Sequence, residues 1–116
     1  MRLKKAGKVK QAITAFQAAR TDPKRRALVL VELGECFQKI EQYKLALSHY
    51  EQALEVCEPQ DTETRKLGLY RAGVLATGLR ELDRADRHLS ELAGMDFGYR
   101  DVSDRLDKVA RLRDSG

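Results

Sequence analysis

The sequence predicts an all-α fold, and three features of its composition support this prediction. Proline occurs only at Pro23 and Pro59, so long helices can form with few interruptions. Valine, isoleucine and threonine are sparse and never alternate with polar residues over the length of a strand, which argues against a sheet. Charged residues make up 34% of the chain, as is typical of amphipathic helices. With 116 residues, the chain has the size of one domain.

Residues 7–20 form the first predicted helix. Its apolar side chains recur at helical spacing and share one face: Val9, Ala12, Ile13, Phe16 and Ala19. Too few residues precede Gly7 to form a partner for this helix, so we expect the chain to be a fragment of a longer array. The alternative is that a second copy of the chain covers this face, and Val9, Ile13 and Phe16 would then form a homo-oligomer interface.

The next two predicted helices are bounded by the two prolines. Asp22 is a suitable N-cap and Pro23 a suitable first residue for a helix that runs to about Ile40. A short turn leads to the third predicted helix, about 43–57, which Pro59 ends.

The remaining predicted helices follow a longer connection. Asp61 is a suitable N-cap for a helix over about 62–79, and a further helix covers about 82–93 with Gly94 as its stop. The last amphipathic segment, 99–112, carries one apolar stripe. We expect it to cap the molecule, because a terminal helix of a repeat array would otherwise expose an apolar face.

The central stretch, 30–53, has internal copies on both sides. A copy 34 residues earlier places Ala12, Phe16 and Ala19 on Ala46, Tyr50 and Ala53. A weaker copy 39 residues later places Leu69, Gly73, Ala76, Ala85, Leu89 and Leu92 on Leu30, Gly34, Phe37, Ala46, Tyr50 and Ala53. A repeat of this length indicates stacked helix pairs, each of which buries its apolar face against its neighbours.

The pattern of the central stretch is that of two helices crossing closely. Small residues, Gly34 and Ala46, allow the backbones to approach, while Leu33, Phe37 and Tyr50 fill the space around them. The spacing Leu30-x2-Leu33-Gly34-x2-Phe37, followed by Ala46-x3-Tyr50-x2-Ala53, resembles the tetratricopeptide-repeat (TPR) family.

The resemblance implies an architecture and a general role. Antiparallel helix-turn-helix repeats would stack as a short right-handed superhelix of about six helices. The expected segments are half of a truncated repeat at 7–22, full repeats at 23–59 and 60–97, and the capping helix at 98–113. The implied role is that of a non-catalytic scaffold for protein–protein interaction.

In the TPR family the first helix of each pair lines a concave groove that binds peptides. By position, the resemblance implies a partly apolar groove lined by Leu28, Val31, Glu35, Gln38, Leu67, Tyr70, Arg71, Val74 and Thr77. Residues 27–31 are apolar all round the helix, so Leu28 and Val31 face away from their own repeat. Either neighbouring helices cover them, or they form the groove floor with Tyr70 as the aromatic anchor.

Chaperone-binding TPR domains clamp the C-terminal carboxylate of their peptide with lysine, asparagine and arginine. At those positions this chain has Val31, Glu35 and Leu67, and only Arg71 fits. Because Glu35 would repel a free carboxylate, we expect that the chain does not bind such tails.

Motifs for catalysis or cofactor binding are absent from the sequence, which has no glycine-rich phosphate loop, HExxH, GxSxG or calcium loop. His49 and His88 are 39 residues apart in equivalent repeat positions, and we expect them to be structural, because no carboxylate or thiol is positioned to complete a metal or catalytic site with them. Cys36 and Cys57 lack a CxxC spacing, so we expect reduced thiols. We therefore expect no enzyme, no metal and no cofactor.

The net charge of +4 is unevenly distributed. Residues 1–26 hold nine Lys/Arg against one acid, a charge of +8, whereas the remaining 90 residues hold 13 against 17, a charge of −4. A basic end can bind nucleic acid or an acidic partner, but a solvated end explains it as well, and Phe16 is its only aromatic residue. No apolar run reaches the roughly 18–20 residues that a membrane span needs. We expect a cytoplasmic module whose partner is a protein or peptide.

Overall fold

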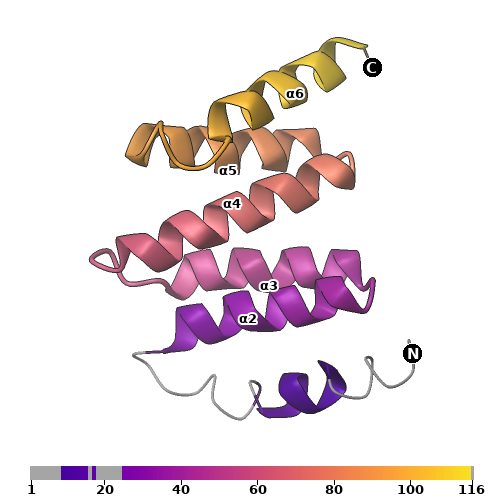
Figure 1. Cartoon of the computed structure of the whole chain (residues 1–116), viewed down its shortest axis with the longest axis vertical. Helices are drawn as coiled ribbons and strands as arrows, with labels where there is room; N and C mark the ends of the chain where they lie inside the picture. Colours follow the sequence, from indigo (N-terminus) through magenta and orange to yellow (C-terminus); the bar gives the residue numbers. More distant parts are fainter. Residues whose placement is uncertain (1–8, 16, 18–24, 116) are drawn as a thin grey trace.

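The computed structural model describes residues 9–15, 17 and 25–115, and over these residues it is helical with no strand (Figure 1). Residues 9–15 are helical. They are followed by α2 (Arg26–Lys39), α3 (Tyr43–Val56), α4 (Thr62–Gly78), α5 (Leu82–Met95) and α6 (Val102–Ser115). The predicted all-α fold is confirmed.

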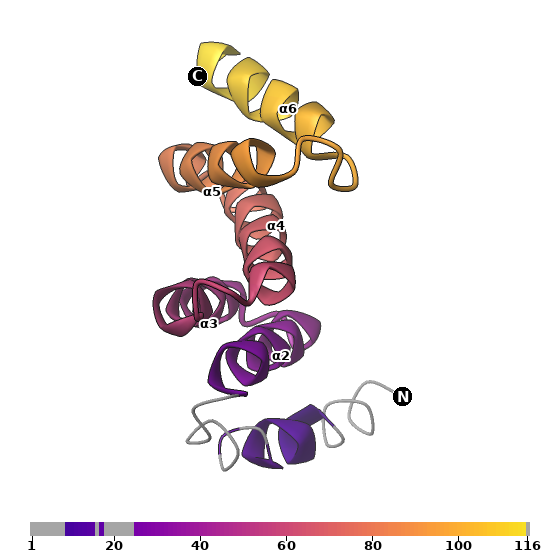
Figure 2. The same ribbon diagram turned by 90° about the vertical axis from the view of Figure 1, so that its left-hand side faces the viewer.

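The helices stack as pairs. The most extensive contacts join α2 with α3 and α4 with α5, and the pairs meet where α3 packs on α4. Figure 2 shows the resulting two layers, with α3 and α5 on one side and α2 and α4 on the other. α6 packs on α5 and touches α4, just as α4 packs on α3 and touches α2. α6 therefore occupies the position of the first helix of a further pair.

Small residues lie where the helices of each pair cross. A Cβ added at Gly34 would lie 2.5 Å from Cε1 of Tyr50, and one added at Gly73 would lie 2.5 Å from Cγ of Leu89. Tyr50 and Leu89 are fully buried. The close crossing predicted from the spacing of glycine and the larger side chain thus occurs in both pairs.

The turns inside the two pairs have the same backbone geometry. In each, an amide beyond the helix donates back to a helical carbonyl at 2.9 Å, from Gln42 to Phe37 and from Glu81 to Ala76. The residue before that amide is left-handed, Glu41 with φ 65° and Arg80 with φ 63°. Neither is glycine, the residue that this helix-ending motif usually contains.

The helix boundaries confirm one predicted signal and correct another. Asp61 is the N-cap of α4, since its side chain accepts a hydrogen bond from the Thr64 amide at 3.3 Å. Gly94 does not end its helix, because α5 continues to Met95. A Cβ at Gly94 would meet nothing within 4 Å. This glycine lies within the helix and does not adopt the left-handed conformation that ends helices. The predicted cap Asp22 lies outside the described residues.

The last helix has one apolar and one charged side. α6 begins at Val102, three residues later than predicted. It buries Val102 and Val109 against the stack, while Asp104, Asp107 and Lys108 are exposed. The outward side of α6 is therefore polar, as expected of a capping helix.

Candidate binding site

The candidate binding site lies on the first helices of the two pairs. Here the "α2–α4 face" means the side chains at helical spacing that are partly or largely exposed there: Leu28, Glu35, Gln38, Leu67, Tyr70, Arg71 and Val74. Leu28 is 38% exposed and is one of several large apolar side chains that are exposed in the described part of the chain. The face mixes apolar groups with hydrogen-bonding ones.

Two residues expected on this face are buried instead. Val31 is 0% exposed, and its Cγ2 lies 3.7 Å from the position that a Cβ would take at Gly68. α4 thus covers Val31, which corrects the expectation that this side chain forms a groove floor. Thr77 is also buried, and its hydroxyl donates to the Gly73 carbonyl at 2.8 Å. Neither side chain can be reached by a ligand in this structure.

An ion pair joins the two helices in the middle of the face. Nη2 of Arg71 lies 2.9 Å from Oε2 of Glu35, with both side chains about one third exposed. The Nε atom of Arg71 is buried and has no hydrogen-bond partner among the described residues. A buried donor without an acceptor costs about 1–3 kcal/mol, so the hydrogen-bonding of this face is least complete at Arg71.

A second polar contact reaches the face from the layer behind it. The Tyr50 hydroxyl, which comes from α3 past Gly34, donates to Oε1 of Gln38 at 2.7 Å. Burial, with a contribution from the nearby Glu35 carboxylate, raises the pKa of Tyr50 well above its usual range, so the hydroxyl stays a neutral donor. The Gln38 amide nitrogen has no hydrogen-bond partner within the described part of the chain.

Tyr70, the expected aromatic anchor, is engaged by the turn before α6. Its hydroxyl donates to Oδ1 of Asp101 at 2.7 Å, its ring centroid lies 5.8 Å from that of Tyr99, and the Arg100 guanidinium lies 5.0 Å from its centroid. Burial, followed by the Asp101 bond, raises the pKa of Tyr70, and the same bond lowers the pKa of Asp101. Nearby, Lys66 pairs with Asp96 at 3.2 Å. Tyr70 therefore fastens α6 to α4.

A charged cluster on the opposite layer was missed by the sequence analysis. Nε2 of His88 lies 2.7 Å from Oε2 of Glu51, and Arg84 binds both carboxylate oxygens of Glu51. Burial opposes ionisation of Glu51, but the hydrogen bonds from Arg84 and His88 outweigh it and lower the pKa of this carboxyl. No local signal could reveal the contact, because it joins α3 to α5.

The other histidine lies apart from this cluster. Nδ1 of His49 is 2.9 Å from the Leu45 carbonyl of its own helix. The ring of His49 packs 4.8 Å from the ring of Phe37. Its contacts are those of a buried packing residue.

The residues expected to form a homo-oligomer interface are not exposed where they are described. Val9 and Ile13 are 9% and 8% exposed and belong to the main hydrophobic cluster. Val9 and Ile13 therefore pack in the chain's own hydrophobic core. Phe16 lies outside the described residues.

The described part of the chain offers no metal site and two free thiols. No group of three or more His, Cys, Asp or Glu residues is arranged there to hold a metal ion. Cys36 and Cys57 are free thiols, and burial raises the pKa of both. None of the helices described is both long and apolar enough to cross a membrane.

The structure thus defines the chain as an all-α stack of helix pairs with a mixed polar and apolar face. Comparison with protein-family models gives no match for this chain, and comparison with curated proteins gives none either.

Proposed function

We propose that this chain is a non-catalytic protein-interaction module of the TPR type, which binds a segment of a partner protein on the α2–α4 face. The observation that carries the proposal is a set of partly exposed hydrogen-bonding groups at the centre of the face: the Gln38 amide nitrogen, which has no partner among the described residues, and the Arg71–Glu35 ion pair. Apolar side chains flank these groups, with Leu28 on α2 and Val74 on α4. A peptide segment supplies both the backbone carbonyls and the apolar side chains that such a face can bind.

The charges of the face favour an internal segment over a chain terminus. Arg71 is already paired with Glu35 at 2.9 Å, so a terminal carboxylate placed on Arg71 would also meet the Glu35 carboxylate. A neutral backbone carbonyl meets no such repulsion. The proposed setting is the cytoplasm, where free thiols such as Cys36 and Cys57 stay reduced.

The test reverses the central ion pair without removing it. The double variant Glu35→Arg with Arg71→Glu keeps opposite charges at the two positions. A ligand would then meet the positive charge on α2 and the negative charge on α4. Proteins cross-linked in cells to the wild-type chain are quantified against those cross-linked to this variant. We expect partners that bind the face to be lost, while the melting temperature stays within a few degrees of the wild type because the ion pair is restored.

A matched reversal of an ion pair between the two layers is the control. Arg65 and Glu91 form an ion pair between α4 and α5, and the variant Arg65→Glu with Glu91→Arg changes the same number of charges. This control should retain the partners. Retention of all partners by the Glu35/Arg71 reversal, or equal loss from both reversals, would contradict the proposed site.

A further inference from the structure

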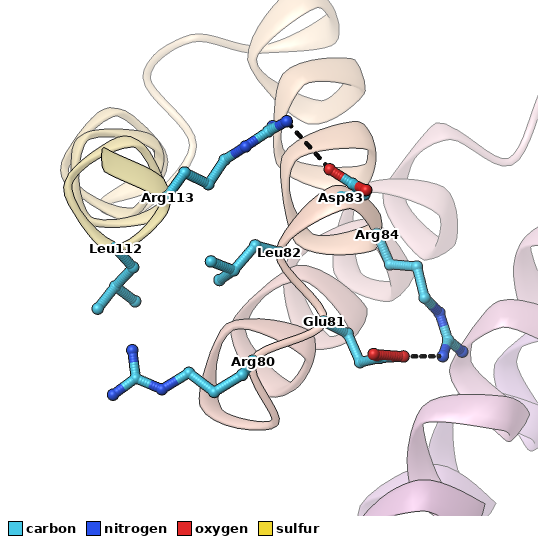
Figure 3. Close-up of a pocket in the computed structure, with 7 residues that line it drawn as sticks. All are labelled: Arg80, Glu81, Leu82, Asp83, Arg84, Leu112 and Arg113. Atoms are coloured by element: carbon cyan, nitrogen blue, oxygen red, sulfur yellow. Dashed lines mark hydrogen bonds and ion pairs between the residues drawn. The ribbon is translucent and has the colours of Figure 1, made fainter. Parts of the chain in front are cut away.

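A trough follows the edge of the molecule at which the pairs turn. One hollow of about 600 Å³ lies between the start of α5 and the end of α6 (Figure 3). A second, of about 380 Å³, lies between the start of α3 and the α4–α5 turn. Both are lined by Glu81 and Arg84, so they adjoin each other. Together they are called the turn-edge trough below.

The lining of the trough is apolar at several points. Leu47 and Leu79 line the smaller hollow, and Leu82 and Leu112 line the larger one. In Figure 3, Leu82 and Leu112 extend into the space between α5 and α6, and the Arg80 side chain extends along the same opening. An apolar side chain inserted there would leave water, which stabilises binding by about 25 cal/mol for each Å² of apolar surface.

The charges of the trough are partly compensated within the chain. Arg113 pairs with Asp83 at 3.0 Å and with Asp86 at 3.5 Å, and Arg84 pairs with Glu81 at 3.1 Å and also with Glu51. Lys44 and Arg80 have no ion-pair partner among the described residues. Because Arg84 and Arg113 are each paired with two acids, the positive charge that stays open to a ligand in the trough is that of Lys44 and Arg80.

We propose that the turn-edge trough is a second docking site, which binds an acidic, leucine-containing segment of a partner protein. The apolar side chain of the segment lies between Leu82 and Leu112, and a carboxylate of the segment binds the Arg80 guanidinium. Charge complementarity selects an acidic segment, and it disfavours the chain's own residues 1–26, which carry +8. The trough shares no residue with the α2–α4 face, so the two proposals are independent.

The probe is a short synthetic peptide of alternating glutamate and leucine, added to the full chain at low salt. Two control peptides replace glutamate by glutamine or leucine by serine. Binding is followed by amide chemical shifts. We expect shifts around Arg80, Leu82 and Leu112 with the first peptide, and much weaker shifts with either control, because both the charge and the apolar contact are needed.

Two variants test the assigned residues. Arg80→Glu should weaken binding of the glutamate–leucine peptide by roughly tenfold, since it replaces an attraction with a repulsion. Leu112→Ser should weaken it to a similar extent through the lost apolar contact, and the fold should tolerate it because Leu112 is partly exposed near the end of α6. Arg87→Glu, an exposed arginine of α5 outside the trough, makes the same charge change and should leave binding within roughly twofold.

Several outcomes would overturn the proposal. These are the absence of shifts at the trough, equal weakening by Arg80→Glu and Arg87→Glu, and shifts confined to the α2–α4 face. A trough that binds phosphatidylserine vesicles through Arg80 without any effect of Leu112→Ser would also overturn it, in favour of an anionic membrane surface. Retention of all partners by the Glu35/Arg71 reversal, together with full peptide binding at the trough, would contradict the α2–α4 face and leave this proposal standing alone.

Discussion

The two helix pairs, α2–α3 and α4–α5, share one backbone path but use their polar side chains differently. In the first pair the Tyr50 hydroxyl bonds to Gln38 of the same pair, and His49 bonds to Leu45 of its own helix. In the second pair Leu89 takes the place of Tyr50 and has no hydroxyl. His88, the counterpart of His49, bonds instead to Glu51 of the preceding pair.

The two pairs therefore differ in the polar contacts that they make with neighbouring helices. The first pair makes internal hydrogen bonds through Tyr50 and His49, and it supplies the carboxylates of Glu35 and Glu51 to cations of the second pair. The second pair bonds outward on both sides, to α3 through Glu51 and to α6 through Tyr70 and Asp101. We infer that α4–α5 holds the stack together, because it is the pair with bonds to both of its neighbours.

The largest expected effect tests the close crossing in each pair. Gly34→Ala and Gly73→Ala should each lower the free energy of unfolding by about 2–3 kcal/mol, because the new Cβ would overlap Tyr50 or Leu89. Urea unfolding measures both. The loss should be larger at Gly34, since the aromatic ring is rigid and its hydroxyl is held by Gln38, whereas Leu89 can change rotamer.

Gly94→Ala is the control for these variants, because its Cβ would enter open space. It should leave the free energy of unfolding unchanged or raise it by up to about 1 kcal/mol, as alanine favours a helix over glycine. A tolerated Gly34→Ala would mean that the helices of the first pair do not cross as closely as the structure has them.

The next largest effect tests the hydrogen bonds that the second pair makes to α3. Glu51→Gln should lower the free energy of unfolding at neutral pH by about 1–2 kcal/mol, because Arg84 and His88 lose an ionised acceptor. The folded-state pKa of Glu51 is lowered, so its contribution is present above the ordinary glutamate pKa and is lost as the pH falls through the folded value.

Stability measured as a function of pH checks the sign of this effect. The wild type and Glu51→Gln should converge in strongly acidic solution and differ most near neutral pH. Glu55→Gln, an exposed acid on the same helix, should match the wild type throughout. A constant difference at all pH values would show that the ionised carboxylate is not the stabilising group.

A smaller loss of stability should appear in different helices for the two pairs. Tyr50→Phe and Tyr70→Phe should each lower the free energy of unfolding by about 1 kcal/mol, the usual worth of one hydrogen bond. Hydrogen exchange should then rise within α2 and α3 for Tyr50→Phe, but within α6 for Tyr70→Phe. The same exchange pattern in both variants would remove the distinction between an inward-bonded and an outward-bonded pair.

The smallest expected change in stability concerns the left-handed turn residue that both pairs contain. Glu41→Gly and Arg80→Gly should each raise the free energy of unfolding by about 0.5–1 kcal/mol, because glycine adopts a left-handed conformation without strain. The two gains should be equal, since the turns match. Gln42→Gly, at φ −90°, is the control and should give no gain. Thermal unfolding resolves the difference.

The sequence by itself determined the helices and their close crossings. These features are local or periodic: apolar residues at helical spacing, Asp61 as a cap, and Gly34 and Gly73 in equivalent positions of a 39-residue repeat. Gly94 was wrongly predicted to end its helix. A glycine marks a helix end only where the backbone turns left-handed, and the left-handed residues that follow α2 and α4 in this structure are Glu41 and Arg80.

The tertiary structure alone decided which side chains of the candidate site are accessible. Val31 is covered by α4 while Leu28, one turn away, is exposed, and Tyr70 is engaged by Asp101, 31 residues further along the chain. Periodicity places a side chain on a face of its helix, but it does not say how closely the neighbouring pair approaches that face. That distance is set by packing between pairs, which joins residues too far apart in the sequence for any local pattern to record.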